Sequence, residues 1–187
     1  MRVLVTGGAG YIGSHVVRAL KQAGHKPVVI DDLSTGHWSL VERNEIELIH
    51  GDAGNQLLLH QVFALHDYDA IIHIAGRALV SESVEDPSQY YRVNTVVGHT
   101  LLEAARRHGV KRFVFSSTCA VYGVPDQLPI SEKCLKAPVS PYGSSKLAFE
   151  YMLHAYTEAY AMKGVALRYF NVAGASAEAD LGEMHEP

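Results

Sequence analysis

The chain has 187 residues, of which 48% are hydrophobic and 19% are charged, and its formal net charge is −4 at pH 7. This length and composition are typical of one globular domain, and the acidic balance argues against a nucleic-acid-binding protein, which needs clustered basic residues. The two cysteines and eleven histidines form no metal-binding motif, and no apolar stretch is long enough to span a membrane, so we expect a cytoplasmic protein without a bound metal.

A glycine-rich turn over residues 6–13 follows a short apolar run that predicts the first strand, and it precedes an amphipathic helix. Gly7 permits a tight turn, Gly10 lets backbone N–H groups approach a pyrophosphate, and Gly13 lets the helix pack close to the strand. The helix N-terminus carries a partial positive charge that favours phosphate groups. The turn therefore predicts a dinucleotide site.

A second buried strand is predicted over residues 26–30, and it ends at Asp31. Asp31 lies 18 residues beyond Gly13, near the position where a dinucleotide-binding fold places a carboxylate against the adenosine ribose diol. Because that carboxylate would repel a 2′-phosphate, we expect NAD rather than NADP.

The rest of the chain alternates short apolar runs with longer periodic segments. Six strands alternating with helices predict an α/β fold, in which a doubly wound parallel sheet of the NAD-binding Rossmann type has helices on both faces. The expected strand order is 3-2-1-4-5-6. We expect the remaining strands over 46–50, 70–74, 112–116 and 164–169, helices over 55–65, over 87–108 and from 141 onward, and a polar loop over 32–40.

A candidate catalytic group follows the fifth strand and opens the next helix. Ser140 and Pro141 predict the start of that helix, which puts Tyr142 and Lys146, four residues apart, on one face. A phenol has a pKa of about 10, and lowering it to about 7 requires roughly 4 kcal/mol of preferential stabilisation of the phenolate. A nearby ammonium and the positive nicotinamide ring supply charge of the required sign. Thr118 adds a hydroxyl that can hydrogen-bond the same substrate oxygen.

Five segments together resemble the UDP-glucose 4-epimerase family of the extended short-chain dehydrogenase/reductase superfamily: residues 6–13, 73–76, 116–123, 141–146 and 167–171. The resemblance implies interconversion of UDP-glucose and UDP-galactose, as in galactose metabolism, by reversible hydride transfer between the sugar C4 and tightly bound NAD. It also implies a UDP-sugar substrate and a homodimer in the full-length form. Related 4,6-dehydratases usually carry Asp-Glu after the threonine, where this chain has Cys119-Ala120.

The same resemblance implies a role for particular residues. Thr118, Tyr142 and Lys146 would be catalytic, and Thr118, Tyr142 and Asn171 would bind the substrate. The implied cofactor-binding residues are Gly7, Gly10, Tyr11, Ile12, Gly13, Asp31, Asp32, Leu33, Ser34, Thr35, Gly36, Asp52, Ala53, Ile74, Ala75, Gly76, Arg77, Ala78, Asn94, Ser116, Tyr142, Lys146 and Phe170. Ala78 departs from family members that carry a lysine there.

We expect residues 1–175 to form the NAD-binding domain, and residues 176–187 to begin a connection to a C-terminal substrate domain that this chain lacks. Apolar surface should then be exposed where that domain would dock. Two alternatives stay open. One is another NAD-dependent sugar-nucleotide modifier, such as a decarboxylase, a uronate epimerase or a dehydratase. The other is an NAD-binding module without turnover.

Overall fold

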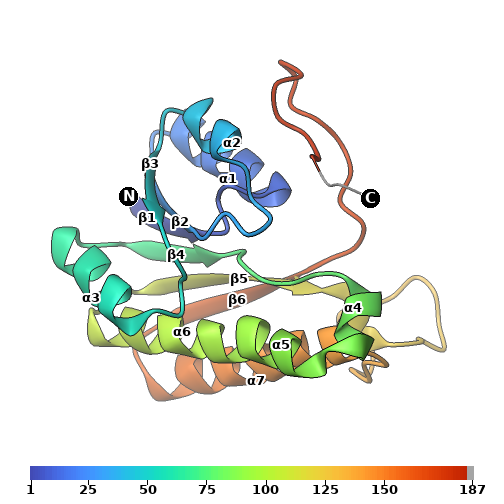
Figure 1. Cartoon of the computed structure of the whole chain (residues 1–187). Coiled ribbons are helices and arrows are strands. Elements are labelled where there is room, and N and C mark those ends of the chain that lie inside the picture. Colours follow the sequence, from blue (N-terminus) through green and yellow to red (C-terminus); the bar gives the residue numbers. More distant parts are fainter. Residues whose placement is uncertain (185–187) are drawn as a thin grey trace.

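A computed structural model describes residues 1–184 and shows one parallel sheet in the order β3-β2-β1-β4-β5-β6, which confirms the predicted doubly wound topology (Figure 1). The strands are β1 (Arg2–Thr6), β2 (Lys26–Asp31), β3 (Glu47–His50), β4 (Ala70–His73), β5 (Arg112–Thr118) and β6 (Lys163–Tyr169). The α-helices are α1 (Tyr11–Gln22), α2 (Trp38–Glu42), α3 (Gln56–Leu65), α4 (Val80–Glu85), α5 (Pro87–Tyr91), α6 (Gly98–Arg107) and α7 (Pro141–Ala159), with a π-helical turn at Arg92–Val97 and a 3₁₀ turn at Cys119–Tyr122.

The helices cover the sheet from two sides, because the strands are apolar on both faces. Figure 1 shows α1 and α2 on one side and α3, α5, α6 and α7 on the other. On the α1 side, Val17 packs against Val3, Val5 and Val29. The opposite side holds the larger core, in which α3, α6 and α7 bury leucine and phenylalanine side chains against β1, β4 and β5. None of the helices in the described part of the chain is long and apolar enough to cross a membrane.

Strand β6 forms one edge of the sheet, and apolar side chains are exposed on and after it. Val165 is 48% exposed and Leu167 is 39% exposed, whereas Ala166 between them packs against the larger core. Phe170 and Val172, just beyond the strand, are also exposed. The exposed apolar surface expected from the sequence is therefore present at this edge.

The segment predicted as one helix over 87–108 contains a π-helical turn between α5 and α6. The turn buries Asn94, whereas Val93 and Val97 are only half-buried. Periodicity alone did not reveal the wider turn, because the apolar positions of α6 resume their normal spacing after it. Two short helices were also missed, α4 and α2, the second of which lies partly within the predicted polar loop.

The chain after β6 returns to α1 (Figure 1). Arg18 forms a bidentate ion pair with Asp180, at 2.5 and 2.7 Å, and Tyr11 donates a hydrogen bond from its hydroxyl to the carbonyl of Gly174 at 2.6 Å. Leu181 is 2% exposed. The expected connection thus packs against α1 through Asp180, and residues 185–187 lie outside the described residues.

His73 joins β4 to β1 beneath the carboxyl edge of the sheet. Its Nδ1 lies 2.7 Å from the hydroxyl oxygen of Thr6, and the side chain is fully buried, with no hydrogen-bond partner for Nε2. Burial, with a smaller contribution from the positive charge of Lys146, lowers the pKa of His73 to about 3. The ring is therefore neutral at physiological pH and serves the core.

Because His73 is buried in its neutral form, we predict that the protein loses stability in acid. Between pH 6.5 and about 3 the unfolded chain binds a proton at His73 that the folded chain does not, so the free energy of unfolding falls as the pH falls through this window. His73→Gln removes this titration. Urea denaturation at pH 7 and pH 4.5 should therefore show a smaller pH-dependent loss for the variant than for the wild type. Equal losses would contradict the assignment.

Candidate active site

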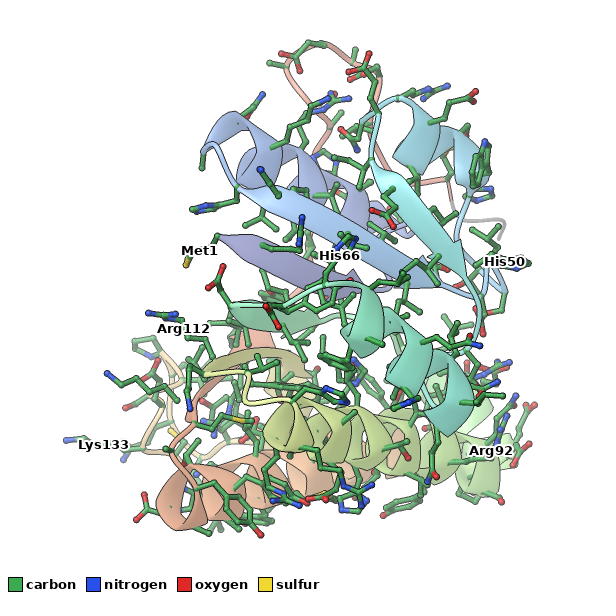
Figure 2. The ribbon with its side chains drawn as sticks, turned by 90° about the vertical axis from the view of Figure 1, so that its left-hand side faces the viewer. Met1, His50, His66, Arg92, Arg112 and Lys133 are labelled. Carbon is green, nitrogen blue, oxygen red and sulfur yellow. The ribbon has the colours of Figure 1, made fainter. Side chains whose placement is uncertain are left out.

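The carboxyl ends of the six parallel strands meet at one edge of the sheet, where ligands bind in folds of this type. In Figure 2, Met1 and Arg112, beside the starts of β1 and β5, lie at one edge, and His50, at the end of β3, lies at the other. Arg92, at the start of the π-helical turn, lies on the same side as His50 (Figure 2). The predicted cofactor and catalytic residues come from segments that follow these strand ends.

The glycine turn is built from close backbone contacts. Gly7 has a φ of +74°, and a Cβ added to it would lie 2.5 Å from the backbone nitrogen of Ala75. A Cβ on Gly13 would lie 1.9 Å from the carbonyl oxygen of Gly7, so α1 rests directly on the turn. Gly8, which was not among the predicted residues, is equally constrained, because a Cβ on it would meet the side chain of Val29 at 2.6 Å.

Gly10 differs from these glycines because it borders open space. The nearest atom to an added Cβ is the carbonyl oxygen of Gly7, at 3.5 Å. Gly10 is also the N-cap of α1 and provides no side-chain hydrogen bond, and the first turn of α1 carries no acidic residue. The N–H groups and the dipole of this 12-residue helix thus face a space that suits a pyrophosphate.

Asp31 lies at the end of β2 and is 8% exposed. One carboxylate oxygen accepts a hydrogen bond from the N–H of Ala9 and the other from the N–H of Leu33, both at 2.9 Å. Burial raises the pKa of Asp31, and these two backbone hydrogen bonds oppose the rise. Gly36 approaches the same carboxylate, since a Cβ on it would lie 2.9 Å from Oδ1. The loop predicted to surround the adenosine ribose is therefore folded around this carboxylate.

A second group of predicted cofactor residues converges beside β4. Asn94 is buried, accepts a hydrogen bond from the N–H of Arg77 at 2.9 Å and donates to the hydroxyl of Ser145 at 3.1 Å. A Cβ on Gly76 would lie 2.8 Å from Oδ1 of Asn94 and 3.1 Å from Nζ of Lys146. The guanidinium of Arg77 pairs with Glu82, and both its backbone N–H and its carbonyl are hydrogen-bonded to the side chain of Asn94.

Other predicted residues lie further from these contacts. Asp52 is exposed and accepts a hydrogen bond from the N–H of Gly54 at 2.7 Å, whereas Ala53 is buried in the larger core. Phe170 and Asn171 follow β6 and are exposed. Nothing in residues 1–184 binds these last two side chains to the rest of the site.

Thr118, Tyr142 and Lys146 come together where β5 meets the start of α7. Ser140 caps α7 by accepting a hydrogen bond from the N–H of Gly143 at 3.2 Å, as the sequence predicted. Lys146 is 4% exposed, and its ammonium donates to the carbonyl of Ser116 at 3.0 Å. Burial lowers the pKa of Lys146 to about 8.

The pKa of Tyr142 moves in the direction opposite to the one expected from the sequence. Burial raises it, and hydrogen bonding with Thr118 only partly opposes this rise. Lys146 does not contribute to the shift, because its ammonium is directed at the carbonyl of Ser116. The protein alone therefore keeps Tyr142 protonated, and a lower pKa requires additional positive charge beside the phenol.

Sequence reasoning missed several residues that support this group. Tyr90 is fully buried, its ring lies edge-on to that of Tyr142 with 6.3 Å between centroids, and its hydroxyl donates to Glu82. Glu150 is also buried, one helical turn after Lys146, and accepts hydrogen bonds from side chains of β5 and β6. The recurrence of polar residues at 142, 146 and 150 was the available signal. No cluster of metal-ligating side chains occurs in the described range 1–184.

The sequence matches the NAD dependent epimerase/dehydratase family over residues 3–185, so the chain belongs to this family. Among curated relatives, it is 50% identical to UDP-glucose 4-epimerase of Azospirillum brasilense over 182 residues, which cover 97% of this chain and 52% of the relative. It is 46% identical to the enzyme of the same name from Halalkalibacterium halodurans, over 100% of this chain and 55% of that relative. The chain thus spans about half the length of these relatives.

Solved structures show the same similarity. UDP-glucose 4-epimerase from Brucella ovis, in complex with NAD, matches with a TM-score of 0.95 and 47% identity, over 98% of this chain and 56% of that one. The enzyme from Bifidobacterium longum, in complex with NAD⁺ and UDP, matches with a TM-score of 0.93 and 35% identity, over 98% and 57% of the two chains. The fold and the family predicted from the sequence are therefore confirmed.

We predict that the Asp31 carboxylate makes the chain bind NAD more tightly than NADP. Asp31→Asn removes the negative charge and keeps one of the two oxygens that accept backbone hydrogen bonds, so NAD binding should weaken by about tenfold and binding of the 2′-phosphorylated form should strengthen. Titration of both dinucleotides by calorimetry measures the ratio. Asp126→Asn removes the same charge from an exposed loop and should leave the ratio unchanged. An unaltered ratio in Asp31→Asn would exclude this carboxylate as the selector.

Proposed function

We propose that this chain forms the cofactor-binding and catalytic part of an NAD-dependent UDP-glucose 4-epimerase, which interconverts UDP-glucose and UDP-galactose. The observation that carries the proposal is the meeting of Thr118, Tyr142 and Lys146 at the carboxyl edge of the sheet, next to a glycine turn that suits a pyrophosphate. NAD, when bound, supplies a reversible hydride acceptor for the sugar C4.

Tyr142 is the proposed acid and base. Its phenol oxygen takes the proton of the sugar 4-hydroxyl and later returns a proton to the 4-oxygen. Thr118 is within hydrogen-bonding reach of Tyr142, which places its hydroxyl beside the same sugar oxygen. Burial raises the pKa of Tyr142. A positive charge that lowers this pKa must therefore be brought to the site when the cofactor and substrate bind.

Lys146 and Asp31 are proposed to hold the two ends of the cofactor. The Lys146 ammonium is buried and has one protein acceptor, the carbonyl of Ser116, which leaves donor capacity for a ribose hydroxyl. The Asp31 carboxylate would accept hydrogen bonds from the adenosine ribose diol. Asn171 would contact the UDP phosphates from the exposed end of β6.

The sequence after Thr118 separates this proposal from one alternative. The dehydratases that the sequence analysis considered carry two acidic residues there, whereas this chain has Cys119 and Ala120. No carboxylate is thus available at that position for the elimination of water. Curated relatives at 42–50% identity, among them those from Azospirillum brasilense and Corynebacterium glutamicum, are named UDP-glucose 4-epimerase, which supports the same choice. We place the enzyme in the cytoplasm, since its two cysteines are free thiols.

Tyr142→Phe tests the catalytic role. Loss of the hydroxyl should lower the turnover of UDP-glucose by at least about 10²-fold, because no other group is placed to move the proton. The dissociation constant for NAD should stay within about threefold of the wild-type value, since the ring and its packing are retained. UDP-galactose formation is followed by proton NMR, and NAD binding by calorimetry.

The same measurements separate the alternatives. UDP-galactose production by the 187-residue chain supports the epimerase, whereas NAD binding without turnover favours a binding module. Conversion of a different UDP-sugar, with loss of carbon dioxide or inversion of a uronate, would identify another modifier. Retained turnover in Tyr142→Phe would rule out the proposed role of the tyrosine.

We also propose that the whole protein is a homodimer that uses the outer surface of α5 and α7. Tyr91 is 42% exposed and Tyr151 is 61% exposed on these helices, which contact each other in the fold. Val96, 57% exposed, adds apolar area from the π-helical turn between α5 and α6. Aromatic side chains of this kind are enriched at subunit interfaces.

Tyr151→Glu tests this surface. The introduced charge should shift the chain from dimer towards monomer in sedimentation velocity, because it cannot be desolvated without a partner. Leu167→Lys places a charge on the exposed edge strand β6 instead. A dimer that is lost in Leu167→Lys and retained in Tyr151→Glu would assign the contact to the edge of the sheet.

A further inference from the structure

Three consecutive residues at the end of β5 contact three residues of α7 that are spaced four apart. The three contacts therefore fall on three turns of one helical face, although their order along α7 differs from their order along β5. This ladder fixes both the rotation of α7 and its position along its own axis. The pairs are Ser116 with Lys146, Ser117 with Glu150, and Thr118 with Tyr142.

Glu150 is the most heavily bonded member of this ladder. It is 9% exposed and accepts hydrogen bonds from the hydroxyl of Ser117 at 2.5 Å and from Nε and Nη2 of Arg168 at 2.9 and 2.7 Å. The Arg168 guanidinium also donates to the hydroxyl of Tyr122 at 2.7 Å and lies over its ring. These partners leave the carboxylate no free role in proton transfer, and they join α7 to β5, to β6 and to the 3₁₀ turn.

Lys146 depends on this arrangement because it is buried with a single protein acceptor. A change of one residue in the position of α7 would move its ammonium by about 1.5 Å along the helix axis. The ammonium would then lose its hydrogen bond to the Ser116 carbonyl and its position over the ring of Phe115. The ionic group at residue 150 lies closer to the middle of α7 and opposes such a shift.

We propose that Glu150, together with Ser117 and Arg168, is a positioning residue that locks α7 against β5 and so holds Lys146 and Tyr142 at the carboxyl edge of the sheet. The placement of Lys146 is independent of any reaction. The effect on turnover rests on the function proposed above. The two parts are therefore tested separately.

The first test measures how accessible Lys146 is in the full 187-residue chain. The folded protein is treated briefly with acetic anhydride, and acetylation of Lys146 is quantified by mass spectrometry relative to the exposed Lys163. Ser117→Ala removes one hydrogen bond but retains the ion pair between Glu150 and Arg168. Acetylation of Lys146 should become at least about tenfold faster, the effect of losing one charge-assisted hydrogen bond on a local opening. Glu150→Gln should accelerate it as well.

Glu103→Gln is the matched control. Glu103, on α6, also accepts hydrogen bonds from an arginine and a hydroxyl, those of Arg106 and of Tyr156 on α7, but it makes no contact with the end of β5. This variant should leave the acetylation of Lys146 unchanged. Wild-type rates in both Ser117→Ala and Glu150→Gln would overturn the inference, and so would an equal acceleration in the control, since the effect would then be a general loss of stability.

The second test uses epimerisation of UDP-glucose. Ser117→Ala should lower kcat by about 10- to 100-fold, as expected for a small displacement of reacting groups, while KM changes by less than about threefold. Ser117→Thr restores a hydroxyl and should recover most of kcat. If the wild type shows no epimerisation, the proposed function fails and the acetylation result still decides the positioning role. If the wild type is active and Ser117→Ala is equally active, the positioning role fails.

Discussion

The close approach of α1 to the backbone of the glycine turn is the constraint on which the arrangement of β1, β2 and α1 depends. The carbonyl of Gly7 occupies the place where a side chain on Gly13 would begin, and the N–H of Ala75 occupies the corresponding place beside Gly7. Any side chain at these positions would force α1 away from β1 and open the turn. Only with this contact in place can the N-terminus of α1 face the same edge of the sheet as Asp31 and His73.

The half of the structure that contains β5 and α7 is held by a different kind of interaction. Here polar groups of β5 and α7 form hydrogen bonds with one another. Because these groups are buried away from water, each requires such a partner. Lys146 and Glu150 carry opposite charges on the same face of α7, yet each is bound to a different residue of β5. The helix is therefore held both near its catalytic end and near its middle.

Much of this could be predicted from the sequence. The strand order followed from the alternation of apolar runs and periodic segments, and the start of α7 followed from Ser140 and Pro141, because these signals are local. The direction of the Tyr142 pKa shift could not be predicted, because it depends on burial by residues distant in the sequence, and Lys146 turns out to bind a backbone carbonyl. The hydrogen bonds of Tyr90 and Arg168 could not be predicted for the same reason, since their partners lie in other elements.

The π-helical turn at Arg92–Val97 has a consequence for engineering. A helix that takes one extra residue in a turn changes phase, so that the faces before and after it are offset by about 100°. Here the offset allows Asn94 to reach Arg77 and Ser145 while the leucines of α6 stay in the larger core. Deletion of one residue from this turn would yield a more regular helix. The deletion would also remove the offset, so that either the leucines of α6 or Asn94 would have to leave its present position. Shortening this segment should therefore not stabilise the protein.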